Sequence, residues 1–568
     1  MKPAATLTAA ALTVTAAAAA AISTLQPFSP SALCSDAPRP NTPRPNIILI
    51  VADDLGGRDL GCYNPDTFYE TPNLDRFARQ SVRFTNGYAA NPVCSPTRVS
   101  LQTGRYPTRT SNTYWFDKGD SSGKSFNFRP PRVTAHLPLD EETLGEGLKK
   151  AGYQTAFVGK WHLGEEEKYW PDRRGYDTDI AGTSAGGPPG GYFSPYKNPR
   201  LPDGPQGEYL PERLTRESIA LLDKMAAVKT KPFFLCHCFY LVHTPLHALE
   251  PLIEKYKAKA KKLGLNNEAD FGVEEQCWPN AGPRRIRVRQ GNPVYAAMIE
   301  TMDTAFGKLM AELDRLGIAD NTLIIFIGDN GGLATTGNAS TSNLPLRAGK
   351  GWLYEGGIRE PFLLRWPAAI KGGVTNDTPI ISNDVLPTFY AAAGQPLPEK
   401  PIDGVNLLPH LQNGAPLDRD ALFWHFPHYG GQGGFPGAAI RMGDWKLIER
   451  FVDGSVQLYN LKNDLSERLD LAPKEPARVA ALRDRLHAWY KEVGAQFLQK
   501  KGPNGPAPWR PGDPPRAGGK KYAASTDDDF RDDNNTPAGL AASALLQRWL
   551  PILPYIRGYT QQGIGWDD

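Results

Sequence analysis

A cysteine followed by a proline and an arginine lies between two pairs of oxygen ligands in this chain. The segment is Cys94-Ser95-Pro96-Thr97-Arg98, and the pairs are Asp53-Asp54 and Asp329-Asn330. Each pair follows a short apolar run, so both belong at the ends of predicted strands. Carboxylate and amide oxygens suit Ca²⁺ or Mg²⁺. An Asp-Asp pair alone is more often a cap or turn, but two pairs at equivalent strand ends predict a metal site.

The residues after Cys94 predict a helix that begins at the motif. Pro96 favours the first helical turn, where its missing N–H costs nothing. Such a helix would point backbone N–H groups at residue 94 and make a suitable seat for an anion. A cysteine taken alone is more often a buried structural thiol, so its neighbours carry the functional interpretation.

Four other polar side chains occupy comparable places. Lys160 and His162 follow the apolar run 155–158, and His243 follows the run 232–242. Lys350 lies in the segment 346–351, where glycines let the backbone approach a ligand closely. Taken singly, such histidines are as often ordinary hydrogen-bonded residues, and lysines usually face solvent. Ligands of an open α/β sheet bind beyond the carboxyl ends of its strands, so we expect these side chains to meet the acidic pairs.

The elements that must position these side chains follow from hydrophobic periodicity. The runs 46–52, 155–158, 232–242 and 322–327 are continuous and apolar, which is typical of parallel strands buried on both faces. Helical spacing of apolar residues predicts helices near 71–78, 143–151 and 295–313. The sequence therefore predicts an α/β fold with a large, mostly parallel central sheet flanked by helices.

The pattern changes after about residue 415. Short strands at 439–441, 445–448 and 457–459, with a turn at Asp453-Gly454, precede a helix that ends near Val493. We therefore predict a catalytic domain at 46–414 and a smaller α+β subdomain with an antiparallel sheet at 415–498. The tail 499–568 is rich in Pro, Gly and Asp, which predicts a loosely packed segment, with an apolar stretch at 545–556 that docks on the body.

The N-terminus and the composition bear on where the protein works. Met1-Lys2 and the Ala-rich run 9–22 predict a signal peptide within residues 1–33, and hence a periplasmic or secreted protein. The run is too short to span a membrane convincingly. A formal net charge of +3 among 568 residues argues for neither a nucleic-acid partner nor stable membrane insertion.

The six cysteines do not form a disulfide framework in a chain of this length. Cys236 and Cys238 point to the same face of a predicted strand. A metal site there is less expected than two small core residues, because no second Cys or His pair follows at zinc spacing. Cys34, Cys62 and Cys277 could pair in an exported protein, but their connectivity is not readable.

Together these motifs resemble the type I, formylglycine-dependent sulfatases, which are arylsulfatase-like enzymes of the alkaline phosphatase superfamily. Cys94–Arg98 and Thr103-Gly104-Arg105 are similar to the family signature, with Thr97 where serine is commoner. Residues 159–164 resemble the second signature of the sulfatase family. His243-Thr244-Pro245, Asp329-Asn330-Gly331 and Lys350 resemble motifs that come later in the family's sequences. The similarity covers roughly residues 46–495, and it implies an alkaline-phosphatase-like sandwich.

The resemblance also implies the chemistry. A maturation enzyme would oxidise Cys94 to formylglycine, whose hydrate attacks a sulfate ester, forms a covalent sulfate ester and then expels sulfate. Calcium would be held by Asp53, Asp54, residue 94, Asp329 and Asn330. Arg98 and Lys160 would hold the hydrate, and His162 would act as base. His243 and Lys350 would bind the sulfate and help to protonate the leaving oxygen, with Lys160 as a further substrate contact.

Two other functions remain open at this point. A phosphodiesterase or phosphonate monoester hydrolase of the same fold could use the same residues, since sulfate and phosphate esters have similar shapes. A secreted glycan-binding protein with a dead site is the other, although every expected site residue is present. Substrate choice would come from the loops 182–192, 112–115 and 424–429, whose aromatic residues suit a sugar or an aryl group. The sulfated substrate and the oligomeric state cannot be read.

Overall fold

The computed structural model describes residues 44–115, 128–265, 270–274, 276–277, 284–336 and 339–516. An eight-stranded sheet in the order β12-β2-β11-β10-β1-β7-β5-β6 forms its centre. Strands β10, β1, β7, β5 and β6 are mutually parallel, whereas β11 runs antiparallel to both β10 and β2. The predicted α/β fold with a large, mostly parallel sheet is therefore confirmed.

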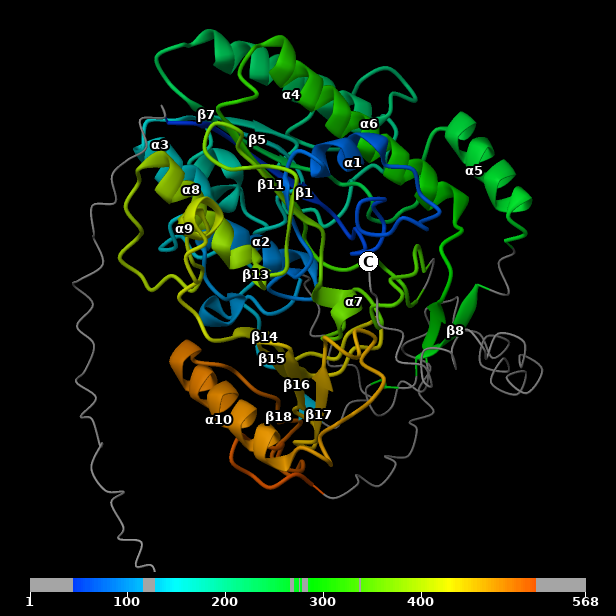
Figure 1. Cartoon of the computed structure of the whole chain (residues 1–568), viewed down its shortest axis with the longest axis vertical. Coiled ribbons are helices and arrows are strands. Elements are labelled where there is room, and N and C mark those ends of the chain that lie inside the picture. Colours follow the sequence, from blue (N-terminus) through cyan, green and yellow to red (C-terminus); the bar gives the residue numbers. More distant parts are fainter. Residues whose placement is uncertain are drawn as a thin grey trace, which may run out of the picture. The chain divides into compact units, whose positions relative to one another are not determined.

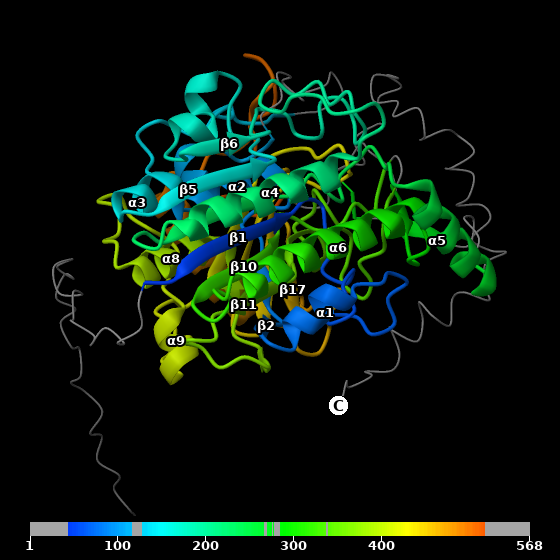
Figure 2. The same ribbon diagram turned by 90° about the horizontal axis from the view of Figure 1, so that it is seen from above.

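The sheet is buried on both faces, as its continuous apolar strands require. Along β1 (Asn46–Ala52), Ile48 and Ile50 pack on one side with helices α1, α4, α5 and α6. Ile47, Leu49 and Val51 pack on the other side with α2, α3 and α8. Figures 1 and 2 show α4 and α6 crossing one face of the sheet, with α2, α3 and α8 beyond the other.

The remaining bounds are as follows. The strands of the central sheet are β2 (Val82–Phe84), β5 (Gln154–Gly159), β6 (Thr178–Ile180), β7 (Phe233–Cys238), β10 (Thr322–Gly328), β11 (Phe362–Arg365) and β12 (Val374–Asn376). The helices are α1 (Pro72–Ala78), α2 (Cys94–Thr103), α3 (Leu144–Lys150), α4 (Leu210–Ala227), α5 (Glu250–Lys262), α6 (Pro293–Arg315), α7 (Glu355–Ile358), α8 (Val385–Ala393), α9 (Leu408–Asn413) and α10 (Pro476–Val493). Short strand pairs join β3 (Gly87–Tyr88) to β13 (Ile380–Ile381), β4 (Phe128–Arg129) to β18 (Gln499–Lys500), and β8 (Phe271–Glu274) to β9 (Arg284–Arg287).

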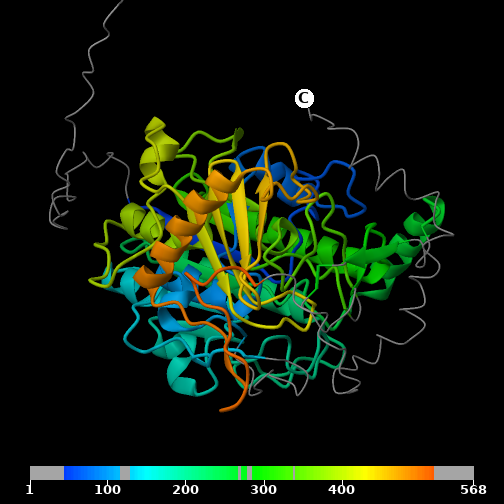
Figure 3. The ribbon, with the colours of Figure 1, turned by 90° about the horizontal axis from the view of Figure 1, so that it is seen from below.

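A second, antiparallel sheet follows the central one in the chain. It consists of β14 (Leu422–Phe426), β15 (Gly437–Met442), β16 (Trp445–Arg450) and β17 (Val456–Asn460), and α10 lies across it (Figure 3). Leu486 and Trp489 of α10 are buried against this sheet. The predicted C-terminal α+β unit is thus present, while the boundary at 414/415 stays a prediction.

Buried polar contacts join the second sheet to the rest of the fold. The Trp424 indole N–H on β14 donates to the Ala89 carbonyl at 2.8 Å. The Lys446 ammonium on β16 lies 2.8 Å from carboxylate oxygens of both Glu355, which opens α7, and Glu467. All three charged side chains are fully buried, so removal of one partner would leave an uncompensated charge in the interior.

Two sequence-based expectations need correction. The segment 424–429 was expected to be a substrate loop, but Trp424, His425 and Phe426 belong to strand β14 and are buried. The beginning of the tail was expected to pack loosely, yet β18 pairs with β4, and Trp509 is fully buried and stacks against Phe451. The structure uses these side chains for packing: every residue of β14 is buried, and so is the large Trp509 ring. The stretches 1–33 and 545–556 lie outside the described residues.

The described cysteines are free thiols. Cys236 and Cys238 are buried on the same side of β7 with their sulfur atoms 3.7 Å apart, as expected for small core residues. Cys62 and Cys277 carry no disulfide, and Cys34 lies outside the described residues. Within the part of the chain that the structure describes, no helix is both long and apolar enough to cross a membrane.

We predict that Trp509→Ala lowers the free energy of unfolding by about 3–5 kcal/mol, the usual cost of emptying a buried tryptophan site. Urea unfolding measures this change. Leu469→Ala is the control, since this side chain is 57% exposed and should change stability by less than about 0.5 kcal/mol. Equal, small changes in the two variants would show that residues 499–516 contribute nothing to the fold.

Candidate active site

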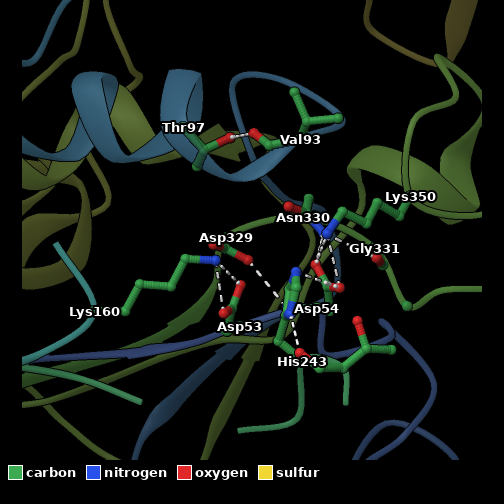
Figure 4. A network of polar contacts seen from close by, with 12 residues as sticks. Asp53, Asp54, Val93, Thr97, Lys160, His243, Asp329, Asn330, Gly331 and Lys350 are labelled. Carbon is green, nitrogen blue, oxygen red and sulfur yellow. Dashed lines mark hydrogen bonds and ion pairs between the residues drawn. The ribbon is translucent and has the colours of Figure 1, made fainter. Parts of the chain in front are cut away.

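The two acidic pairs meet at the carboxyl ends of β1 and β10. Ala52 and Gly328, the last residues of these parallel strands, are partners in the sheet register. The Asp329 N–H donates to the Ala52 carbonyl at 3.0 Å, and the Asp54 N–H donates to Asp329 Oδ1 at 3.1 Å. Figure 4 shows Asp53, Asp54, Asp329 and Asn330 gathered at this edge. The structure therefore brings together the oxygen ligands that the sequence analysis selected.

Three buried cations each face one of the three carboxylates. Lys160 Nζ, at the end of β5, contacts both Asp53 oxygens at 2.8 and 2.7 Å. Lys350 Nζ lies 2.8 Å from both Asp54 oxygens. The Arg98 guanidinium on α2 donates to Asp329 Oδ2 at 3.0 and 2.7 Å, and to the carbonyl of Lys160 at 2.8 Å. The cluster thus carries no net charge without a metal ion.

Cys94 occupies the first position of α2, as the Pro96 pattern predicted. The side chain is 2% exposed, and Val93 precedes the helix in an extended conformation. Burial, partly offset by Lys160 and Lys350, raises the pKa of the Cys94 thiol to about 11. The unmodified side chain is therefore a neutral thiol near pH 7 and a poor nucleophile.

A group of ligand atoms surrounds the cysteine. Oxygens of Asp53 and Asp54, the Cys94 sulfur and a His243 ring nitrogen all lie within 4.8 Å of one another. Asn330 Nδ2 donates to Asp54 Oδ1 at 2.8 Å, while the buried Asn330 Oδ1 has no hydrogen-bond partner among the described residues. Such an orphaned oxygen beside carboxylates fits a hard cation. Asp329 is less available, since its oxygens already accept from Arg98 and Asp54.

The two histidines of the site are neutral near pH 7. Burial, together with Lys350, lowers the pKa of His243 to about 3, although Asp54 opposes this shift. Its Nδ1 lies 2.7 Å from the Thr244 carbonyl, and Nε2 lies 3.7 Å from Asp54 Oδ2. Burial lowers the pKa of His162 well below its usual value, and Lys160 and Arg98 lower it further.

The pKa values of Asp53 and Asp54 shift in opposite directions. Burial raises the pKa of Asp53, an effect that Asp329 and Asp54 increase and Lys160 opposes. Burial also acts to raise the pKa of Asp54, but Lys350, His243 and Lys160 outweigh it, and the pKa falls below its usual range. Asp54 is therefore held as an anion, which is the form that coordinates a metal.

Backbone conformations at the site are unusual for residues with side chains. Asp54 has φ 58° and His162 has φ 59°, both in the left-handed region. Ala348, two residues before Lys350, has φ 58°. Such conformations cost about 1–3 kcal/mol each and persist where the surroundings over-determine them, commonly at functional sites.

Two acidic residues near the site were missed by the sequence analysis. Asp59 accepts hydrogen bonds from Gly56 N–H, the Tyr295 hydroxyl, Thr341 and Gln290, and thereby ties the loop after β1 to three other segments. Its proximity to Asp53-Asp54 was the only available signal. Glu360 is buried with no hydrogen-bond partner for either oxygen among the described residues, and burial raises its pKa well above the usual value.

Of the three predicted substrate loops, the structure places 182–192 against His162 and His243. A Cβ on Gly186 would lie 2.9 Å from His162 Cε1, and one on Gly187 would lie 3.5 Å from His243 Nδ1. The Tyr192 hydroxyl at the end of the loop donates to the Tyr240 and His243 carbonyls at 2.5 and 2.9 Å. The loop therefore closes one side of the site.

The loop 112–115 is mostly committed to packing. Asn112 is fully buried and donates to the carbonyls of Thr134 and His136. Thr113 lies 2.8 Å from the buried His428 Nε2, and Tyr114 contacts the same imidazole ring. Trp115 is only partly buried. These contacts join the loop to the segment 424–429 and correct the expectation that both segments are free to bind a substrate.

The α/β fold and a group of metal-ligand atoms around Cys94, the first residue of α2, are typical of hydrolases of the sulfatase class. The comparisons with known proteins agree. The family model described as Sulfatase matches residues 45–395, and a model for the C-terminal part of N-sulphoglucosamine sulphohydrolase matches residues 348–493. The chain belongs to the sulfatase family, and the protein is a sulfuric ester hydrolase.

Individual relatives are similar over most of their length. Human N-acetylgalactosamine-6-sulfatase is 32% identical over 69% of both chains. A sulfatase of Formosa agariphila is 30% identical over 81% of this chain and 91% of its own. The crystal structure of Ps i-CgsB in complex with k-i-k-neocarrahexaose has 29% identity, a TM-score of 0.63, and covers 79% of this chain and 93% of the other.

We predict that Gly186→Ala lowers kcat/KM for sulfate esters roughly 10- to 100-fold, because the new methyl group would displace the His162 ring. The matched control is Gly187→Ala, whose Cβ would meet its nearest neighbour, the Thr244 carbonyl, at an ordinary 3.4 Å. Steady-state kinetics on an aryl sulfate compares the two. Equal losses in both variants would show that crowding of His162 is not the cause.

Proposed function

We propose that this protein is an exported sulfatase that hydrolyses sulfate esters of carbohydrates, and also aryl sulfates, with formylglycine at position 94 and Ca²⁺. The observation that carries the proposal is the position of Cys94. It lies at the start of α2, among two carboxylates and a histidine whose ligand atoms are within 4.8 Å. A neutral buried thiol has no evident use there, whereas an oxidised side chain beside a cation has one.

The side chains around residue 94 fit both Ca²⁺ and formylglycine. Asp53, Asp54, residue 94 and Asn330 would hold Ca²⁺, with Asp329 as a further ligand that is also held by Arg98. Formylglycine would supply an aldehyde whose hydrate offers one hydroxyl for attack on sulfur and a second to release the sulfate. Calcium would supply positive charge beside the sulfate oxygens. Mg²⁺ fits less well, because it demands a stricter octahedral arrangement.

The side chains around residue 94 have separable tasks in this proposal. Lys160 and Arg98 hold the carboxylates of Asp53 and Asp329 and provide positive charge beside residue 94. His162 has a pKa well below neutrality, so it is present as a base able to accept a proton from the hydrate. Lys160 also contacts the substrate's sulfate group. These are roles for charge and proton transfer, which are the steps that sulfate ester hydrolysis requires.

His243 and Lys350 act on the substrate side. Both lie against Asp54, and Lys350 is held protonated because Asp54 and Cys94 raise its pKa against the effect of burial. A lysine so charged can bind the sulfate oxygens and, together with His243, direct a proton to the leaving oxygen. Esters with poor leaving groups, such as sugar alcohols, depend most on this help.

The relatives support carbohydrate substrates. One is a human N-acetylgalactosamine-6-sulfatase, and another similar structure contains a neocarrahexaose. Arylsulfatase A, 33% identical over 72% of this chain, supports a capacity for aryl sulfates. A phosphonate monoester hydrolase shares the fold with a TM-score of 0.53 and 19% identity, which supports no shared substrate.

The proposal includes a maturation enzyme as partner and a location outside the cytoplasm. An oxidising maturation enzyme must reach Cys94, which is buried in the folded protein, so it would act on the unfolded chain. Export would follow from the apolar N-terminal run. A secreted glycan-binding protein with a dead site is disfavoured, because every position expected to be catalytic carries the residue type that the chemistry needs.

We predict that active preparations contain formylglycine at position 94, and that Cys94→Ala lowers kcat by at least about 10³-fold without loss of the fold. Mass spectrometry of the peptide spanning residues 84–98 detects the conversion of the Cys94 CH2–SH group to an aldehyde, in which oxygen replaces sulfur and two hydrogens are lost. Circular dichroism and thermal melting control for folding. Full turnover of a sulfate ester by a preparation with an unmodified Cys94 would contradict the mechanism.

We predict that Ca²⁺ raises the melting temperature and restores the activity of chelator-treated protein. The stabilisation should be about 2.7 kcal/mol when free calcium is 100 times its dissociation constant. The three paired cations relieve repulsion among the carboxylates, so the apo protein should still fold. Asn330→Ala should weaken the response, and Mg²⁺ serves as the comparison ion. If the melting temperature and the hydrolysis rate were the same with chelator and with calcium, the protein would not use a metal ion.

A further inference from the structure

A cluster of arginines lies outside the catalytic cluster, on the β8–β9 hairpin and the segment that follows it. Arg285 is exposed and its guanidinium lies 3.6 Å from the centre of the Phe271 ring. Arg287, two residues further along β9, lies 4.4 Å from the same ring. Arg289 is 45% exposed. Three guanidinium groups are therefore collected on one side of a single short hairpin.

Acidic side chains balance only part of this charge. Asp270 lies 3.5 Å from Arg287 and 3.9 Å from Arg289, and is their carboxylate partner among the described residues. Glu274 on the same hairpin is already paired with Arg347. Arg285 forms no ion pair with any described residue, so the group has two positive charges in excess. Like charges held together are unfavourable unless an anion is also bound.

The segment borders the loops that carry the catalytic side chains. The backbone N–H of Arg287 donates to the carbonyl of Ala334, four residues after Asn330. Gln290 donates to Asp59, five residues after Asp54. The side chain of Arg284 lies against Gly433, whose neighbour Gln432 is packed against Gly351, next to Lys350. Three separate contacts thus join this hairpin to segments that continue from the loops carrying Asp54, Asn330 and Lys350.

The stacking geometry suits recognition of a sulfate or carboxylate group. A guanidinium laid flat on an aromatic ring keeps its N–H edge free for bidentate hydrogen bonds to an anion. Phe271 also restricts the motion of Arg285, so less side-chain entropy is lost on binding. Burial lowers the pKa of Arg287, and Arg285 contributes to this, which is consistent with their mutual proximity.

We propose that Arg285 and Arg289, which are exposed, form a second anion subsite to which the buried Arg287 adds positive charge; the subsite binds another sulfate or carboxylate group of a polyanionic glycan while the scissile sulfate ester occupies the catalytic site. This inference rests on the proposed function and narrows its substrate class. It favours multiply charged glycans over isolated monosulfated sugars. Small aryl sulfates would not reach the subsite.

The test separates binding at the hairpin from catalysis. Binding of a persulfated maltotetraose is measured by titration calorimetry in the calcium-loaded Cys94→Ala background, where no turnover occurs. Adding Arg285→Gln should weaken binding about 3- to 10-fold, as expected for loss of one partly exposed charge-assisted contact. Arg289→Gln should act in the same direction, and a monosulfated maltotetraose should be insensitive to both changes.

A matched control exists on α10. Arg478 also lies over an aromatic ring, that of Trp445 at 4.0 Å, and Figure 1 shows α10 well apart from β8. Arg478→Gln removes the same charge and should leave persulfated maltotetraose binding unchanged. Equal weakening by Arg478→Gln and Arg285→Gln, or no weakening by Arg285→Gln, would overturn the subsite.

Activity distinguishes failure of the subsite from failure of the proposed function. With Cys94 intact, Arg285→Gln should leave kcat/KM for 4-nitrocatechol sulfate within about twofold of the unmodified sequence, since exposed substitutions rarely disturb a distant site. A larger loss on this small substrate would overturn the assignment of Arg285 to a remote subsite. Absence of any aryl sulfate hydrolysis would refute the proposed function, while the calorimetry would still decide the subsite.

Discussion

Charge balance at the carboxyl ends of two neighbouring strands is the constraint on which the rest of the structure depends. Asp53, Asp54 and Asp329 are buried, and an isolated buried carboxylate is strongly unfavourable. Lys160, Lys350 and Arg98 compensate them one to one. Because these cations come from the end of β5, a distant loop and α2, while the carboxylates follow β1 and β10, the fold must bring five segments together before the acidic pairs can be buried.

The same balance explains how the site can select an anion. Three carboxylates and three cations sum to zero, so one divalent cation gives the cluster a net charge of +2. That charge would lie beside the N-terminal N–H groups of α2, which also favour an anion. Loop 182–192, with glycines against His162 and His243, closes one side of the site.

Support for the cluster extends into the C-terminal sheet. Arg347, three residues before Lys350, donates to Glu274 and to the Glu467 carbonyl. Glu467 and Glu355 share the buried Lys446 on β16. The loop that carries Lys350 is thus fastened by charged contacts to elements more than 90 residues further along the chain. This explains why Lys350, although it lies in a glycine-rich loop, can be positioned firmly beside Asp54.

Much of the fold and site was determined by the sequence alone, because local patterns decide it. Continuous apolar runs specified β1, β5 and β10, and polar residues directly after them located Asp53, Lys160 and Asp329. Tertiary structure decided which charges pair, since Lys350 and Asp54 are 296 residues apart and spacing cannot relate them. It also buried Trp424 in β14, within a segment expected to be an aromatic substrate loop, and Trp509 in a tail rich in Pro, Gly and Asp. Burial of a large aromatic ring releases more free energy than local propensity costs, and only the folded chain shows where such a ring fits.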